Sequence, residues 1–319
     1  MISCKLATSL IIASLAFGGC AAFVDQRAHK RESQAEMDYP PTGQFVTVQG
    51  ARIHVDVQGS GPDLVLIHGA SGNSRDFTFD LVERLKSDFR VISFDRPGMG
   101  WSQGLPGTDL SPLAQADVLI AAAGQLGATR PIVLGHSYGG AVAMAWALRA
   151  NPAALIIVSG ATMPFPGDLA LWYKVTASTL GGAGIVPLIT AFAPESQVET
   201  ALSNIFTPQS APKGYADYIG AGLTLRRDSL RVNGRQVDNL KPHLLLMAPD
   251  YPRLSLPVEI IHGTADTTVP IDIHAIPLSK RLPNARLTVL DGVGHMPHHS
   301  NPDEIIAAIK RAASPRSSP

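Results

Sequence analysis

The chain contains few cysteines, few charged residues and no excess of charge of either sign. Only 2 of its 319 residues are cysteine, too few for a disulfide scaffold or a cysteine-based zinc site. Charged residues make up 16%, and 26 Lys and Arg balance 26 Asp and Glu, so no long-range field exists to concentrate nucleic acid. Apolar residues reach 45%, with 29 Gly and 25 Pro, which argues against disorder and coiled coil. These figures predict a turn-rich globular protein, long enough for one large α/β domain or two small ones.

The first two dozen residues differ in character from the rest. Lys5 is followed by an uncharged run from Leu6 to Val24. The most apolar part of this run is followed by Gly18-Gly19-Cys20, so the segment has the positive start, apolar stretch and small residues of a secretory signal. The run is also just long enough to cross a membrane as a helix. The pattern therefore predicts a signal peptide or an N-terminal anchor.

The segment Leu15-Ala16-Phe17-Gly18-Gly19-Cys20 resembles a bacterial lipobox, although Phe17 stands where that family usually has Leu. The resemblance implies cleavage before Cys20 and lipidation of that cysteine. We expect residues 1–19 to be a signal peptide and the protein to be a membrane-anchored lipoprotein of the bacterial cell envelope. A periplasmic or secreted form after cleavage and an uncleaved anchor are the alternatives.

Changes in composition divide the remaining chain. Residues 20–43 are polar and charged and contain Pro40-Pro41, which predicts a tether that holds the domain off a membrane. Residues 44–161 and 253–313 alternate short apolar runs with helical patterns. Residues 162–252 interrupt this alternation with aromatic residues and Gly and Pro breaks. A disordered tail is expected at residues 314–319.

The alternating segments predict a doubly wound, mostly parallel sheet of eight strands, whose ligand site lies beyond the carboxyl ends of the strands. The expected strands are 45–48, 52–57, 64–67, 91–94, 132–134, 155–159, 258–261 and 287–290. The expected helices are 77–86, 110–126, 138–150, 273–281 and 302–312.

A Gly-x-Ser-x-Gly pentapeptide lies between the strand at 132–134 and the following helix, and places Ser137 at its centre. In a strand-turn-helix context this pattern is typical of a nucleophile elbow, which exposes the serine hydroxyl. Serine needs a base, and the base needs an orienting group. Asp266 and His295 each follow a later strand, in the chain order that this elbow requires. Asp291, four residues before His295, is the other candidate acid and is expected to form a turn.

The chain resembles the α/β-hydrolases at four blocks, which are His68-Gly69-Ala70-Ser71-Gly72-Asn73, Asp95 to Ser102, the elbow at Gly135 to Gly140, and the two loops with Asp266 and His295. The resemblance covers residues 45–313 and implies that Ser137 is the nucleophile, His295 the general base and acid, and Asp266 the orienting carboxylate. It implies an oxyanion hole of the Ala70 and Tyr138 backbone N–H groups. Asp95 and Arg96 are expected to brace each other and their loop. A serine at the elbow departs from the dehalogenase and epoxide-hydrolase branches, which have aspartate there.

In this fold, an insertion at 162–252 forms a helical cap over the site. We expect a carboxylesterase that cleaves small to medium, largely apolar esters through an acyl-enzyme. Alternatives on the same residues are a lipase, a C–C bond hydrolase, a perhydrolase or a proline iminopeptidase, and a ligand receptor without catalysis is a different class. No cofactor is expected, because this chemistry requires none and nothing in the chain resembles a nucleotide-binding loop. No metal is expected, because His298 and His299 lack a second cluster of carboxylates or cysteines and are expected to lie in a solvated turn. The oligomeric state is not readable from the sequence.

Overall fold

The computed structural model describes residues 2–105, 107, 110–167 and 170–314, and the side chains of these residues from Gly18 onward. Most of the expected C-terminal tail, 315–319, lies outside the described residues. The eight strands form one sheet in the order β1-β2-β4-β3-β5-β6-β7-β8, in which β2 runs antiparallel to both neighbours and all other pairs are parallel. The predicted sheet is thereby confirmed. The strands are β1 (Gln44–Val48), β2 (Ala51–Gln58), β3 (Asp63–Ile67), β4 (Arg90–Phe94), β5 (Ile132–His136), β6 (Ala154–Val158), β7 (Val258–Gly263) and β8 (Ala285–Leu290).

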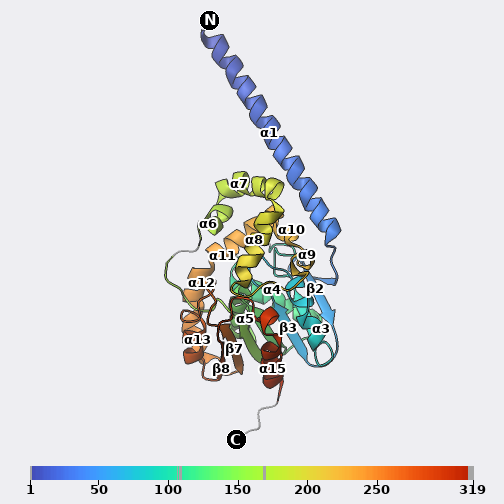
Figure 1. The fold of residues 1–319 in the computed structure, drawn as a ribbon, viewed down its shortest axis with the longest axis vertical. Coiled ribbons are helices and arrows are strands. Elements are labelled where there is room, and N and C mark those ends of the chain that lie inside the picture. The colour runs from blue at the N-terminus through green and yellow to red at the C-terminus, as the bar shows by residue number, and fades with distance from the viewer. Residues whose placement is uncertain (1, 106, 108–109, 168–169, 315–319) are drawn as a thin grey trace.

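The central strands are apolar on both faces because helices cover both faces (Figure 1). In β3, Leu64 and Leu66 pack in one core cluster, whereas Val65 and Ile67 pack in the other. This alternation follows from the two-residue period of a strand. The first cluster includes residues of α3 (Leu81–Leu85) and α15 (Pro302–Ala313), and the second includes residues of α4 (Pro112–Gln125), α5 (Tyr138–Arg149) and α13 (Ala275–Arg281).

The helix expected at 77–86 is instead two short helices, α2 (Arg75–Thr78) and α3. Asp80 interrupts the helical backbone with φ −148° and ψ −46°. Phe77 and Leu81 are both buried against the sheet, so each short helix turns its own apolar residue inward. The break lets α2 follow the loop after β3 and keeps Asp76 beside the carboxyl ends of the strands.

The insertion between β6 and β7 is helical, as predicted. Its elements are α6 (Leu171–Ala177), α7 (Thr179–Phe192), α8 (Glu195–Phe206), α9 (Tyr215–Tyr218), α10 (Ala221–Thr224), α11 (Arg227–Asp238), α12 (Leu240–Met247) and the 3-10 helix η1 (Ala248–Arg253). Figure 1 shows α6, α7 and α8 above the sheet, on the same side of the body as the N-terminal helix α1 (Ile2–Asp38). We refer to α6–α12 with η1 as the cap.

The expected tether is a helix in the structure. Residues 20–38 are the C-terminal half of α1, and this half packs on the cap rather than extending freely. The reason is a set of long-range ion pairs, because Arg227 at the start of α11 binds both Glu32 and Asp25, and Arg226 binds Glu36 at 2.9 Å. Charged residues of α1 that the sequence predicts to be solvated thus form ion pairs with cap residues about 200 positions later in the chain.

Apolar and backbone contacts complete the docking of α1. Ala28 is fully buried, and Arg27 Nε and Arg31 donate to the carbonyl oxygens of Ala191 and Ala193, each at 2.8 Å. A cavity of about 820 Å³ lies beside this interface and is lined by residues of α1, α11, the β1–β2 turn and the loop at 98–104. Ser137, Asp266 and His295 are not among the residues that line it.

One bent helix pair has the length and composition of a membrane span. α6 and α7 pass that test only together, and they are bent by 103° at the break between them. Among the residues whose side chains the structure describes, no single helix passes it.

Candidate active site

Ser137 occupies the turn between β5 and α5 with φ 52° and ψ −120°, a conformation that is unfavourable for a residue with a side chain. Two hydrogen bonds fix this turn to the end of β6. The Ser137 amide donates to the Val158 carbonyl at 3.1 Å, and its carbonyl accepts from the Ala161 amide at 2.9 Å. The serine is therefore held at the carboxyl edge of the sheet in a strained turn, as an elbow requires.

The glycines around Ser137 are present because the turn leaves no room for side chains. A Cβ on Gly135 would overlap the backbone of Gly139, and a Cβ on Gly139 would overlap the carbonyl oxygen of Ile67. A Cβ on Gly69, in the loop after β3, would lie 3.0 Å from Ser137 Cβ and 3.1 Å from His136 Nδ1. The loop after β3 thus lies directly against the serine.

His295 and Asp266 are in direct contact. His295 Nδ1 lies 2.8 Å from Asp266 Oδ2, and both side chains are buried. The other carboxylate oxygen, Oδ1, accepts from the backbone amides of Thr268 at 2.9 Å and Val269 at 2.8 Å. The carboxylate is therefore fixed by the turn after β7, and it fixes the imidazole in turn.

A second histidine supports the same carboxylate. His262 Nε2 lies 2.7 Å from the Val269 carbonyl and 3.2 Å from Asp266 Oδ2. Burial acts to raise the pKa of Asp266, but the hydrogen bonds from His262 and His295 outweigh it and hold this pKa well below its usual value. Asp266 is therefore ionised at neutral pH, which favours the His295 tautomer with its proton on Nδ1.

Arg96 orients the loop that contains Ala70. Its guanidinium donates to the carbonyl oxygens of His68 and Gly69, each at 3.0 Å, and the Gly69 oxygen also lies 2.8 Å from His68 Nδ1. In a trans peptide the N–H points opposite to the preceding C=O. The Ala70 N–H is therefore turned away from Arg96.

Asp95 and Arg96 bind different partners, which differs from the expectation that they brace each other and their loop. Asp95 accepts from the Ser74 amide at 2.6 Å and the Trp101 amide at 2.7 Å, and lies 2.8 Å from His54 Nδ1. Burial acts to raise its pKa, but the hydrogen bond with His54, the nearby His68 ring and the Trp101 amide outweigh it and lower the pKa to about 2. Asp95 thus ties the loops after β3 and β4 to β2.

His136, the residue before Ser137, contacts the loop that contains His295. Its Nε2 lies 2.9 Å from the backbone carbonyl oxygen of His295, and the two rings are 5.0 Å apart between centroids. Burial, together with the nearby His298 and His295, lowers the pKa of His136 well below its usual value. A neutral His136 can donate from Nε2 and so link the nucleophile turn to the His295 loop.

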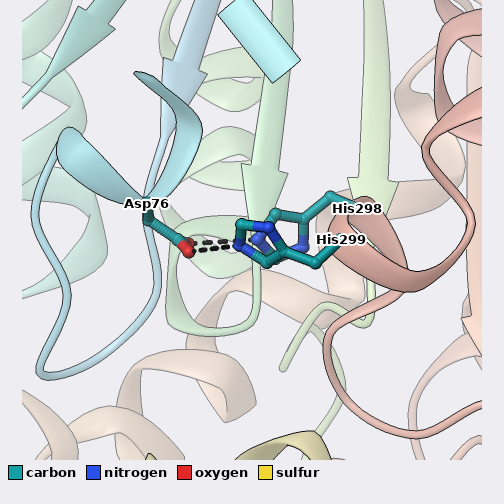
Figure 2. A group of neighbouring side chains, drawn as sticks. All are labelled: Asp76, His298 and His299. Carbon is teal, nitrogen blue, oxygen red and sulfur yellow. Dashed lines mark hydrogen bonds and ion pairs between the residues drawn. The ribbon is translucent and has the colours of Figure 1, made fainter. Parts of the chain in front are cut away.

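Asp76, on α2, faces His298 and His299 (Figure 2). Its carboxylate lies 3.1 Å from His298 Nε2 and 2.8 Å from His299 Nε2, and it accepts a 2.7 Å hydrogen bond from the Tyr215 hydroxyl. The rings of His298 and His136 lie 4.3 Å apart. We call Asp76, His136, His298, His299 and Tyr215 the Asp76 cluster.

Asp76 is the buried acid of this cluster. Burial acts to raise the pKa of Asp76, but His298 and His299 outweigh it and lower the pKa well below the usual value. Burial lowers the pKa of His298 to about 4. The ligand atoms of Asp76, His298 and His299 all lie within 4.8 Å of one another, close enough to converge on a metal ion. In the observed arrangement, both Nε2 atoms face carboxylate oxygens at hydrogen-bond distance, whereas the Nδ1 atoms of His136 and His298 are buried with no hydrogen-bond partner among the described residues.

The match to known families follows this geometry. Residues 64–308 match the model of the alpha/beta hydrolase family. The chain belongs to this family. A curated relative, the pimeloyl-[acyl-carrier protein] methyl ester esterase of Vibrio parahaemolyticus, is 30% identical over 261 residues, which are 81% of this hydrolase and 96% of the relative.

Two solved structures have the same fold at low sequence identity. An esterase from a Rhodococcus species matches with a TM-score of 0.67 and 20% identity, over 84% of this hydrolase and 97% of that chain. A membrane phospholipase A matches with a TM-score of 0.65 and 18% identity, over 99% of this hydrolase and 100% of that chain. The second match extends over α1 as well as the core and cap.

The cap of this hydrolase is hydrogen-bonded to two loops of the candidate site. Asn233 of α11 accepts from the Ser71 amide at 2.8 Å, next to Ala70. Gln209, between α8 and α9, accepts from the Gly294 amide at 2.8 Å, next to His295. Movement of the cap would therefore shift the loops that contain Ala70 and His295.

The structure brings the predicted residues Ser137, Asp266 and His295 to one edge of the sheet, with Ala70 in the loop after β3 and Tyr138 at the first position of α5. Asp291 is exposed and accepts from the Thr264 hydroxyl at 3.1 Å, as a turn residue does. Cys20 is exposed on α1, outside the site.

The expectation that His298 and His299 lie in a solvated turn is wrong. His298 is 1% exposed, and both bind Asp76. Three histidines within five residues after a strand, starting at His295, are a signal that could have identified part of this network. Asp76 belongs to no recognisable motif, and only the fold brings it to the histidines.

Proposed function

We propose that this hydrolase is a serine carboxylesterase acting on small to medium, largely apolar esters. The observation that supports it most is the buried pair of Asp266 and His295, 2.8 Å apart, placed against a strained elbow with Ser137 at its tip. The named activity of the Vibrio parahaemolyticus relative, hydrolysis of a methyl ester, supports the same bond type.

In the proposed reaction, Ser137 Oγ attacks the ester carbonyl carbon while His295 Nε2 takes the serine proton. Asp266 holds the Nδ1 proton of His295 and stabilises the imidazolium that forms. The tetrahedral oxyanion accepts hydrogen bonds from the Ala70 and Tyr138 N–H groups. Loss of one such donor typically costs on the order of 10² to 10³ in rate.

The second half of the reaction releases the enzyme. His295 gives its proton to the leaving alkoxide, so an alcohol departs and an acyl-Ser137 ester remains. Water then donates a proton to His295 and attacks the acyl carbon, and the serine leaves with that proton as the carboxylic acid is released. No cofactor takes part in these steps.

The test is hydrolysis of p-nitrophenyl esters from acetate to longer acyl chains by the wild-type protein and by Ser137→Ala. We expect turnover by the wild type with a preference for short to medium chains, and a loss on the order of 10⁴-fold or more in kcat for Ser137→Ala with unchanged circular dichroism. Undiminished turnover by a folded Ser137→Ala protein would refute the assignment. A panel with amide, C–C and peroxide-forming reactions separates the esterase from its alternatives.

We also propose that the protein is attached to the bacterial cell membrane through lipid on Cys20. The sequence pattern before Cys20 supports this, and so does the exposure of that residue on α1. In cells, the wild-type protein should fractionate with membranes and incorporate labelled palmitate. Cys20→Ser should lose the label, and a wild-type protein without label would contradict the proposal.

A further inference from the structure

The cap has an apolar face that faces outward. Six large apolar side chains of α6 and α7 are exposed, from 42% for Trp172 to 87% for Leu180. They are Leu171, Trp172, Leu180, Ile185, Leu188 and Phe192. We call these six residues the α6–α7 face.

The composition of α7 reinforces this exposure. Its 14 residues, Thr179–Phe192, include no charged side chain, although the helix lies on the outside of the body (Figure 1). A soluble surface helix normally keeps a polar face toward water. Contiguous exposed apolar side chains mark a surface that contacts a membrane or another molecule.

The N-terminal helix passes beside this face and becomes uncharged at the same level. The rings of Phe23 and Phe192 lie 6.3 Å apart, and the Arg27 guanidinium lies 5.0 Å from the Phe192 ring. The uncharged run of the sequence ends at Val24, and the first charge after it is Asp25. The boundary between apolar and charged sequence on α1 therefore coincides with the C-terminal end of α7.

Both forms of attachment bring a bilayer to this level. An uncleaved α1 would place Leu6–Val24 in the hydrocarbon, and at 1.5 Å per residue this run nearly matches a hydrocarbon core of about 30 Å. A lipidated Cys20 would place its acyl chains within one helical turn of Phe23. The ion pairs of Glu32 and Asp25 with Arg227 hold the cap to α1, so the cap cannot move far from that boundary.

We propose that the α6–α7 face lies on the lipid bilayer, with its apolar side chains among the headgroups and upper acyl chains. The site with Ser137 then opens under a cap that touches the membrane. The inference builds on the proposed membrane attachment and is independent of the ester hydrolysis. Lipid is favoured as the occupant over a second copy of the chain because the apolar part of α1 leaves the body beside this face.

Trp172 is a natural reporter for the test. The other two tryptophans are Trp146, which is buried, and Trp101, which donates to the Tyr39 carbonyl at 2.9 Å. The full chain is reconstituted into vesicles of phosphatidylcholine and phosphatidylglycerol, with bromine atoms at shallow or deep acyl positions. We expect the shallow bromines to quench tryptophan emission strongly, the deep bromines to quench it weakly, and Trp172→Phe to lose the quenchable emission.

Charged substitutions test the surface itself. In the reconstituted full chain, Leu180→Asp and Leu188→Asp should each lose most of the quenching of Trp172 by the shallow bromines, because each places a charge where an apolar side chain meets lipid. Ser196→Asp, an exposed residue of α8 outside the face, is the matched control and should leave the quenching unchanged. All three variants should hydrolyse a soluble ester at the wild-type rate.

Several results would overturn the proposal. Unquenched Trp172 in a chain that floats with the vesicles would show that the cap faces water. Failure of the full chain to bind vesicles would also contradict it. A dimer that Leu180→Asp dissociates, with no quenching by lipid, would assign the face to a second copy. Quenching that persists in Ser137→Ala would separate this result from any failure of the esterase assignment.

Discussion

The loops around Ser137 and the α6–α7 face differ in where their side chains find contacts. Around Ser137, most buried polar groups have partners inside the protein, as the contacts of Asp266, Asp76 and Arg96 show, although ring nitrogens such as His136 Nδ1 and His298 Nδ1 lack a partner among the described residues. On the α6–α7 face, apolar side chains such as Leu180 are exposed to water. The polar groups of the first region are thus mostly paired within the chain, whereas the chain does not cover the apolar groups of the second.

The difference indicates where each region can tolerate change. In a buried network, removal of one group leaves its partners unsatisfied, which costs more than the lost bond. On an exposed face, substitutions change stability little because the side chains touch few neighbours. Mutations in the first region should therefore affect catalysis and stability, and those in the second should affect association alone.

The largest effect is expected for Asp266→Asn. The amide cannot hold His295 in the tautomer that accepts a proton from Ser137, and the loss in kcat should be about 10⁴-fold. Asp291→Asn, at an exposed acid four residues before His295, is the control and should keep wild-type kcat. Steady-state kinetics with p-nitrophenyl butyrate measures both. If the effects of the two variants were reversed, Asp291 would be the orienting acid.

Gly69→Ala should have the next largest effect. Its methyl group would lie 3.0 Å from Ser137 Cβ, so the loop that contains Ala70 must shift away from the serine. Displacement of one oxyanion donor predicts a kcat loss of about 10²-fold with KM little changed. Gly124→Ala, on a helix where an added Cβ meets nothing within 4 Å, should retain activity. Wild-type kcat in Gly69→Ala would contradict the placement of the oxyanion loop.

Asp76→Asn tests the network behind the site. An amide offers one acceptor oxygen where His298, His299 and Tyr215 need two, so the unfolding free energy should fall by about 1–3 kcal/mol. A loss in kcat of roughly tenfold is expected with it, because His136 links the cluster to the His295 carbonyl. Asp228→Asn, at a residue exposed on α11, should change stability by less than about 0.5 kcal/mol. Urea denaturation gives the comparison, and equal stabilities would remove the cluster from the account.

Acid should weaken the first region selectively. Burial lowers the pKa values of His68, His274 and His298 to about 4, so below pH 6.5 the unfolded chain binds protons that the folded chain does not. The unfolding free energy should then fall as the pH drops from 6.5 to 4, by at most about 1.4 kcal/mol per pH unit for each histidine. Asp266 and Asp76, with lowered pKa values, add a further loss below about pH 4. If the unfolding free energy from urea denaturation stayed constant from pH 7 to pH 4.5, this would contradict the claim that these histidines are buried and neutral in the folded protein.

Much of the fold could be predicted because local sequence determines it. The eight strands are short apolar runs bounded by Gly and Pro, and they become strands because helices cover both sides of the sheet. The elbow could be predicted because close backbone approach requires glycine at Gly135 and Gly139, which produces a recognisable Gly-x-Ser-x-Gly pattern. Asp266 and His295 could be predicted as candidate acid and base because each follows a later strand in the expected chain order.

The rest depends on contacts between distant segments. The sequence of residues 20–38 predicts a solvated tether, but the fold of the cap places Arg227 beside Glu32. Asp76 joins this network only because the fold places α2 beside His298, which lies more than 200 residues later in the sequence. The partner of an isolated charged residue cannot be predicted from a single sequence, because such ion pairs form between segments that only the fold brings together.

The central claim is that Ser137 is the nucleophile, and covalent labelling tests it most directly. The wild-type protein is treated with a fluorophosphonate, digested and sequenced by mass spectrometry, beside Asp266→Asn as a folded protein with a weakened base. We predict one phosphonyl adduct, on Ser137, that forms much more slowly in Asp266→Asn. An unlabelled wild-type protein, or an adduct on another serine, would contradict the account.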